Sequence, residues 1–195
     1  YSVKHIWAND IDPDACSTYR LNICKDINDQ SVVPGDVRDP DEFDIELQKK
    51  IDILAFGFPC NDFSLVAEKK GLKGQYGPLY SYGVKAIDHH KPRVFIAENV
   101  SGLKSSAEGK TFDLILDKLS KAGKGYRLTV NKFQFENYGI PQKRHRIVIV
   151  GIKKGSHKRF EVPKELPRFL KNPLTCEKAF ADIKPHHPNQ IPTKN

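Results

Sequence analysis

The 195-residue sequence has no methionine, one tryptophan and no long apolar run. A helix that crosses a membrane needs roughly 18 or more consecutive apolar residues, so the sequence predicts no membrane span. The first residues lack the charged and apolar regions of a secretory signal peptide. Because the chain has no initiating methionine and opens directly on a strand-like segment, we expect it to be part of a longer protein.

The sequence has few cysteines, and their spacing matches no paired motif. The four cysteines form no C-x-x-C pair and show no metal-ligand spacing; they are Cys16, Cys24, Cys60 and Cys176. This usage is typical of a reducing compartment and argues against a disulfide framework or a structural zinc site. We therefore predict no metal cofactor.

Acidic residues are outnumbered, with 24 against 32 basic residues and a formal net charge of +8. An excess of this sign favours a polyanionic partner such as a nucleic acid. A solvated, lysine-rich surface would give the same charge, so the charge alone leaves both interpretations open.

Strand-like and helix-like segments alternate along the chain. We predict strands at 3–8, 31–33, 53–58, 93–97, 126–135 and 146–152, and helices at 12–22, 41–50, 79–90 and around 112–119. This alternation predicts an α/β fold with a parallel sheet and helices on both faces. Prolines concentrate after residue 155, so we expect a domain at 1–154 and an irregular segment at 155–195.

An acidic or reactive side chain follows each of four successive predicted strands: Asp10, Asp36, Cys60 and Glu98. The carboxyl ends of parallel strands meet at one edge of a sheet, where ligands bind. Two arginines, Arg144 and Arg146, begin the last strand, and they reach the same edge if that strand is antiparallel. Gln142 precedes them at a spacing of two, which predicts one shared face.

Cys60 is the most reactive of these groups. The apolar segment 53–58 looks like a strand buried on both faces, and it stops at Pro59, which has no N–H to continue a ladder. A thiol directly after it lies in a suitable place for a nucleophile. A small buried hydrophobe is the alternative, since most free cysteines are of that kind.

Three motifs favour the interpretation of Cys60 as a nucleophile over that of a small buried hydrophobe. Residues 58–64 read FPCNDFS, residues 97–100 read AENV, and residues 138–146 read YGIPQKRHR. In order and separation they resemble the Pro-Cys-x-x-Phe-Ser, Glu-Asn-Val and Gln-x-Arg-x-Arg motifs of the cytosine-C5 DNA methyltransferases. The resemblance covers roughly residues 3–152. It implies a Rossmann-like, S-adenosylmethionine-dependent methyltransferase sheet, mostly parallel with an antiparallel last strand.

The resemblance also implies a covalent mechanism. Cys60 would add to C6 of a cytosine flipped out of the duplex, which turns the unreactive C5 into an enamine carbon. Glu98 would stabilise the charge that develops at N3. Arg144 and Arg146 would favour the thiolate and hold the base and flanking phosphates. The sequence does not indicate which side chain acts as the base that removes the C5 proton.

The cofactor and the substrate receive further residues from the resemblance. Asp10 would accept hydrogen bonds from the ribose, a role also expected from its place after an early strand. The other implied cofactor residues are Ile11, Asp36, Val37, Phe58, Pro59 and Leu79; without the family context, Asp36 reads equally well as a turn residue. The other implied substrate residues are Ser64, Asn99 and Gln142.

The sequence also departs from the family pattern. The glycine-rich loop that holds the methionine end of the cofactor and the region that reads the DNA sequence have no counterpart in these 195 residues. Asn61 stands where the family often has glutamine. Tyr76 stands where an arginine is common, which puts one phosphate contact in doubt.

The leading interpretation is a restriction–modification enzyme that methylates double-stranded DNA, in the bacterial cytoplasm, without a metal or a membrane. A tRNA cytosine-C5 methyltransferase of the same family has the same motifs. A non-catalytic nucleic-acid-binding fragment is a third interpretation, against which the intact Cys60 and Glu98 argue. A cysteine hydrolase would need a histidine partner, for which His89, His90 and His145 are the candidates.

Overall fold

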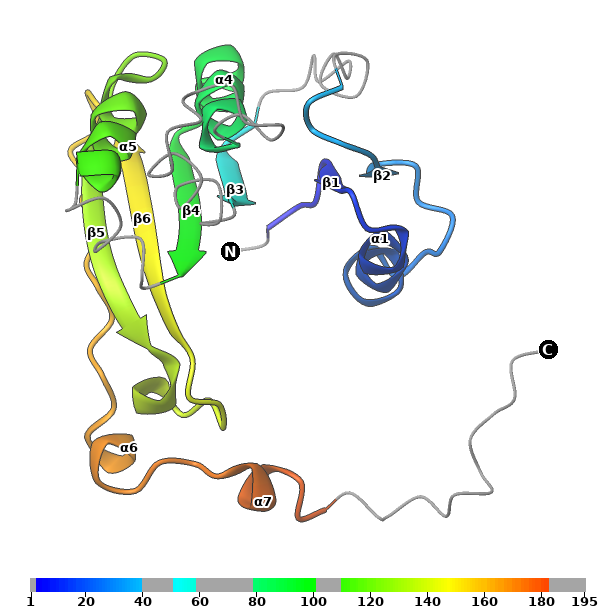
Figure 1. Ribbon diagram of the computed structural model, residues 1–195, viewed down its shortest axis with the longest axis vertical. Helices are drawn as coiled ribbons and strands as arrows, with labels where there is room; N and C mark the ends of the chain where they lie inside the picture. The colour runs from blue at the N-terminus through cyan, green and yellow to red at the C-terminus, as the bar shows by residue number, and fades with distance from the viewer. Residues whose placement is uncertain (1–2, 40–50, 59–78, 101–109, 183–195) are drawn as a thin grey trace, which may run out of the picture.

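The computed structural model describes residues 3–39, 51–58, 79–100 and 110–182. Within them the chain forms two sheets (Figure 1). The strands are β1 (Ala8–Asp10), β2 (Val32–Pro34), β3 (Ile53–Gly57), β4 (Val94–Val100), β5 (Tyr126–Gln134) and β6 (His145–Lys153). The helices are α1 (Pro13–Tyr19), the π-helix η1 (Arg20–Cys24), α4 (Tyr80–His90), α5 (Lys110–Lys121), the 3-10 helix η4 (Phe135–Tyr138), α6 (Pro167–Lys171) and α7 (Cys176–Ala179).

The larger sheet has the strand order β3-β4-β6-β5. β3 and β4 are parallel, whereas β6 is antiparallel to both of its neighbours, β4 and β5. β3, β4 and β5 therefore run in one direction and β6 runs in the other. The predicted α/β class with an antiparallel last strand is confirmed.

Helices α4 and α5 cover one face of this sheet (Figure 1). The spacing of Phe112, Ile115, Leu116 and Leu119 predicts one apolar side of α5; Leu116 is half-buried against the core, and the other three are buried in it. They pack against sheet residues such as Phe95 and Ile149. Each fully buried apolar side chain of this size contributes roughly 1.5–3 kcal/mol to the free energy of unfolding.

Strand β3 is less buried than its sequence predicts. Ile53, Ala55 and Gly57 are exposed, and Leu54 and Phe56 are only half-buried. The expectation of a strand buried on both faces was wrong for the described residues. Among the described residues β3 pairs with β4 alone and so forms an edge of the sheet. Only the face that carries Leu54 and Phe56 packs against the core.

The smaller sheet joins β1 to β2 in parallel, with Ala8 opposite Val32. Asp12 caps α1 by accepting hydrogen bonds from the backbone N–H groups of Asp14 and Ala15, and Pro13 occupies the first turn. In Figure 1 this unit lies beyond β3, on the side of the larger sheet away from β6.

Several strand boundaries differ from the prediction. The first strand lies at Ala8–Asp10 and not at 3–8, so Asp10 is its last residue. β4 continues to Val100, beyond the predicted end at residue 97, because its pairing with β6 persists as far as Val100 opposite Arg146. Glu98 therefore lies within a strand and not after one. The predicted helix at 41–50 lies outside the described residues.

Among the described residues 155–182 the chain is mostly irregular, as predicted, but it contains two short helices that the sequence analysis missed, α6 and α7. Pro167 begins α6, and the Thr175 side chain caps α7. The segment is tied to the β5–β6 connection: Leu166 donates from its backbone N–H to Asn137 O at 3.0 Å, and the Tyr138 hydroxyl donates to Pro163 O at 3.0 Å. The predicted domain boundary near residue 154 stays a prediction. None of the described helices is long and apolar enough to cross a membrane.

Candidate active site

Glu98 and Arg146 form an ion pair at the end of β4 and the start of β6. The Arg146 Nε lies 2.7 Å from the Glu98 Oε1. The Arg146 side chain is 17% exposed and the Glu98 side chain is 42% exposed, so the pair sits at a solvent-accessible margin of the sheet. A Cβ atom added to Gly57 would lie 3.7 Å from the Glu98 Oε2, which places the carboxylate beside the last residue of β3.

Asn99 binds the backbone of Phe58, the residue directly after β3. It is 2% exposed, its Nδ2 donates to the carbonyl oxygen of Phe58 at 2.8 Å, and its Oδ1 accepts from the Val100 N–H at 2.7 Å. The side chain is thus bound on both sides to the protein backbone. Its predicted contact with the substrate is untested, but its contact with Phe58 positions the chain directly before Pro59.

The basic motif forms an open pocket of about 480 Å³, lined by Gln142, Lys143, Arg144, His145 and Arg146. The side chains of Gln142 and Arg144 are exposed. β6 begins only at His145, so the alternation expected to place Gln142, Arg144 and Arg146 on one face does not extend to the first two. Arg146 alone of the three lies in the strand and reaches Glu98.

His145 contacts a residue that the sequence analysis did not select. Its Nε2 lies 2.7 Å from the Oε1 of Glu136 in η4, with 30% of the His145 and 16% of the Glu136 side chain exposed. The hydrogen bond from His145 lowers the pKa of the Glu136 carboxyl. The signal in the sequence is faint, because the two residues are nine apart and face each other only once the β5–β6 hairpin has formed.

Asp10 and Asp36 lie on the smaller sheet. The backbone N–H of Gly35 donates to Asp10 O at 2.9 Å, and Asn9 donates from Nδ2 to Val33 O and Gly35 O, each at 3.0 Å. These bonds hold the ends of β1 and β2 together, so Asp10, the last residue of β1, and Asp36, two residues after β2, lie at neighbouring strand ends. The Asp10 Oδ1 accepts from the Asp12 N–H at 2.9 Å.

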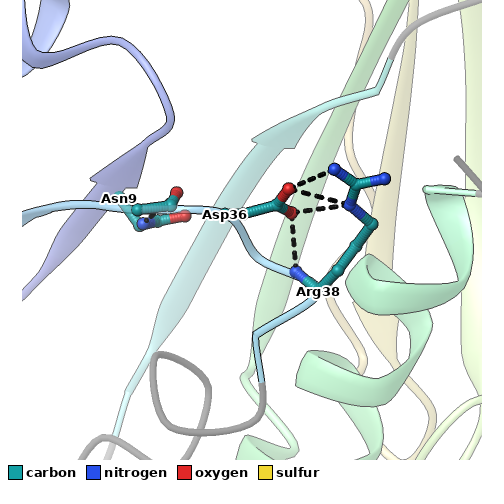
Figure 2. Close-up of polar contacts among 4 residues, drawn as sticks. Asn9, Asp36 and Arg38 are labelled. Atoms are coloured by element: carbon teal, nitrogen blue, oxygen red, sulfur yellow. Dashed lines mark hydrogen bonds and ion pairs between the residues drawn. The ribbon is translucent and has the colours of Figure 1, made fainter.

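Asp36 is bound by Arg38 in a two-pronged ion pair, with both carboxylate oxygens facing the guanidinium (Figure 2). The backbone N–H of Arg38 also donates to the Asp36 Oδ1 at 2.9 Å. The Arg38 side-chain and backbone hydrogen bonds lower the pKa of Asp36 to about 2. Asp36 is therefore a carboxylate, and a hydrogen-bond acceptor, at any ordinary pH.

The remaining predicted cofactor residues differ in exposure. Ile11 is 66% exposed, which suits a side chain that packs on a ligand. Val37 and Leu79 are half-buried. Phe58 is 6% exposed and packs edge-on against Tyr80, with ring centroids 6.4 Å apart. Three predicted site residues lie outside the described residues: Pro59, Cys60 and Ser64.

His5, Cys24 and Asp29 also converge, with ligand atoms within 4.8 Å of one another. The sequence analysis missed this group because its members are far apart in the chain. Its polar atoms have partners in the protein: the Asp29 Oδ1 accepts from the Ser31 N–H at 2.8 Å, and the His5 Nε2 lies 2.8 Å from the Ser31 Oγ. These bonds explain the cluster without an ion, and the absence of a metal cofactor stays a prediction.

Comparison with known proteins identifies the family. A model of the family described as C-5 cytosine-specific DNA methylase matches residues 1–195. The chain belongs to this family. Members of the C-5 cytosine-specific DNA methylase family use S-adenosylmethionine as the methyl donor. The ion pair of Glu98 and Arg146 joins two of the motifs that resemble this family, AENV and YGIPQKRHR.

Two relatives within the family are informative. The chain is 53% identical over 185 residues to the Type II methyltransferase M.BbvI of Brevibacillus brevis, which is 94% of this chain and 49% of the relative. It is 35% identical over 148 residues to the Type II methyltransferase M.NgoFVII of Neisseria gonorrhoeae, covering 76% of this chain and 37% of the relative. The chain thus spans at most about half the length of these curated relatives.

Solved structures share the fold at low identity. A prophage-encoded protein of E. coli superimposes with a TM-score of 0.66 at 20% identity, covering 91% of this chain and 48% of that one. DNMT2 of Spodoptera frugiperda gives a TM-score of 0.60 at 19% identity, covering 84% and 48%. These similarities support the methyltransferase fold.

Proposed function

We propose that the complete protein transfers a methyl group from S-adenosylmethionine to C5 of cytosine in double-stranded DNA, as the modification enzyme of a restriction–modification system. The observation that carries the proposal is the placement of Glu98. Its carboxylate lies beside Gly57 at the end of β3 and is bound by Arg146. The Asn99 side chain holds the Phe58 carbonyl oxygen near this site, and Cys60 follows Phe58 by two residues in the sequence.

In the proposed reaction, the Cys60 thiolate adds to C6 of the flipped cytosine and forms a carbon–sulfur bond. The displaced electron pair moves toward C5 and N3, where Glu98 stabilises it by a hydrogen bond or a proton. C5 then attacks the methyl carbon, and the bond between that carbon and the cofactor sulfur breaks as the new carbon–carbon bond forms, which would leave the sulfur as a neutral thioether. Loss of the C5 proton to a base and departure of the Cys60 thiolate restore the aromatic ring, so that the enzyme ends in its initial state.

The carboxylates of the smaller sheet fit the adenosine end of the cofactor. The cofactor would supply an electrophilic methyl group. Asp10 and Asp36 are exposed or half-buried carboxylates at adjacent strand ends, suited to hydroxyl and amine donors. Ile11 offers an exposed apolar surface for a ring. Arg38 contacts both carboxylate oxygens of Asp36, so the adenine amine would share this carboxylate with Arg38.

Double-stranded DNA is favoured over tRNA because the relatives at 53% and 35% identity are both Type II methyltransferases. The net charge of +8 suits either polymer. A DNA-modifying role would place the protein with the chromosome in the bacterial cytoplasm.

The test is transfer of labelled methyl groups by the complete protein to duplex DNA and, separately, to tRNA. We expect label in duplex DNA, located at C5 of cytosine, and none with Cys60→Ala. Label in tRNA alone would favour the second branch of the family. No transfer to either polymer by the wild-type protein would contradict the proposed enzyme.

A further inference from the structure

Arg146 is held at two places. Its Nε donates to Glu98, and its Nη1 donates to the carbonyl oxygen of His145 at 2.9 Å. The position of the guanidinium therefore depends on where the His145 backbone lies. A displacement of that carbonyl would move the arginine relative to Glu98.

His145 is in turn held by Glu136 through the 2.7 Å contact between Nε2 and Oε1. An ionised carboxylate only accepts hydrogen bonds, and the pKa of Glu136 is lowered, so the proton of this bond resides on the His145 Nε2. A continuous series of contacts thus runs from Glu136 through His145 and Arg146 to Glu98.

The hairpin does not need this pair to close. The Phe135 N–H donates to Arg144 O at 3.1 Å, and the Gln142 N–H donates to Ile140 O at 2.8 Å. Gly139 has a φ of +85°, the left-handed conformation that glycine adopts at little cost, and turns the chain after η4. Because backbone bonds and a glycine form the turn, the Glu136–His145 pair is available for another purpose.

Glu136 is half-buried in η4. Its Oε2 is buried and has no hydrogen-bond partner among the residues that the structure describes. After the hydrogen bond from His145, backbone hydrogen bonds from Glu136 and Arg144 also lower the pKa of this carboxyl.

We propose that Glu136 is a positioning residue for methyl transfer: through His145 it sets the place of Arg146 and so the orientation of the Glu98 carboxylate toward the cytosine ring. This inference rests on the proposed function. It assigns a role to a residue outside the three motifs, on a contact that joins η4 to the basic motif. Glu136 does not touch the reacting atoms in this scheme; it acts through the residues that do.

The experiment compares Glu136→Ala, Glu136→Gln and His145→Asn in the complete protein, with Glu165→Gln as the matched control. Glu165 accepts a hydrogen bond from Asn137, which lies in the same β5–β6 connection as Glu136. Among the described residues, no hydrogen bond or ion pair joins Glu165 to His145 or Arg146. The readouts are the single-turnover rate of methyl transfer to duplex DNA, the KM for DNA, the Kd for S-adenosylmethionine, and the thermal midpoint.

A displacement of about 1 Å in a catalytic group can cost roughly 100-fold in rate, so we expect a 10- to 100-fold loss for Glu136→Ala. The Kd for the cofactor should not change, since Asp10 and Asp36 lie on the other sheet. Glu136→Gln should recover most of the rate, because its amide oxygen still accepts from the His145 Nε2. The control should match the wild type.

The double variant Glu136→Ala with His145→Asn should lose no more rate than either single variant, since both break the same contact. If Glu136→Ala fails to fold, His145→Asn tests the pair from the other side. Wild-type rates in both single variants, or additive losses in the double variant, would overturn the inference. A wild-type protein without methyl transfer would instead overturn the proposed function.

Discussion

Arg146 reaches Glu98 across two antiparallel strands at a distance of 2.7 Å, although the two residues are not directly opposite. Glu98 faces Val148 and Arg146 faces Val100, so they are diagonal neighbours on one face of the sheet. The long arginine side chain spans that diagonal. An ion pair this accessible to solvent adds about 0–1 kcal/mol of stability, so its significance is the orientation of the carboxylate.

Substitution of Cys60 tests the covalent step. A duplex that carries 5-fluorocytosine at the target position has no C5 proton to lose, so the adduct with the thiol cannot resolve after methyl transfer. We expect a denaturant-stable protein–DNA complex with the wild-type protein and none with Cys60→Ala, seen by denaturing gel electrophoresis. Cys176→Ala, at an exposed cysteine, is the control and should still form the complex. A complex that persists in Cys60→Ala would show that another nucleophile is used.

Glu98→Gln should reduce the rate of methyl transfer by about 10- to 1,000-fold, because an amide cannot transfer a proton to N3 as the negative charge develops there. Cofactor affinity, measured by calorimetry, should stay nearly unchanged. Asp117→Asn, at an exposed site on α5, is the control. The assignment of Glu98 to the base would be wrong if the glutamine variant lost cofactor binding and kept its turnover at saturation.

Arg38→Ala should raise the pKa of Asp36 from about 2 toward the ordinary aspartate value near 4. The folded-state pKa is depressed, so the pair stabilises the protein above the ordinary pKa, and that contribution is lost as the pH falls through about 2. A carbon-13 NMR titration of the Asp36 carboxyl measures the shift directly.

Cofactor affinity should also fall in Arg38→Ala, because the carboxylate loses its fixed orientation. Arg93→Ala is the matched control, since Arg93 lies 3.8 Å from Asp52 and is 76% exposed. Unchanged titration of Asp36 in Arg38→Ala would mean that the ion pair does not govern its charge.

Asn99→Ala should lower the free energy of unfolding by about 1–3 kcal/mol, because it leaves the buried Phe58 carbonyl and the Val100 N–H without a partner. Urea unfolding measures this change. The rate of methyl transfer should fall as well, since Phe58 precedes Pro59 and Cys60. Asn131→Ala, on an exposed hydrogen bond of β5, should alter neither quantity. Wild-type stability in Asn99→Ala would argue against the positioning role of this side chain.

Much of the fold follows from local patterns. The spacing of Phe112, Ile115 and Leu119 predicts the buried side of α5, and Asp12 with Pro13 predicts the start of α1. Both features depend on neighbours within a few residues, so a sequence shows them directly. The boundaries of β1 and β4 were predicted less well, because a strand ends where its partner ends and not where its own residues change.

The motifs around Cys60, Glu98 and Arg146 indicate the family from the sequence alone, since such motifs are runs of neighbouring residues. The sequence does not show their mutual geometry. That Arg146 meets Glu98, that Asn99 is buried against Phe58, and that Glu136 binds His145 all depend on which residues the strand register places together. A shift of one residue in register would turn each side chain to the other face, so only the tertiary pairing of the strands decides which of them touch.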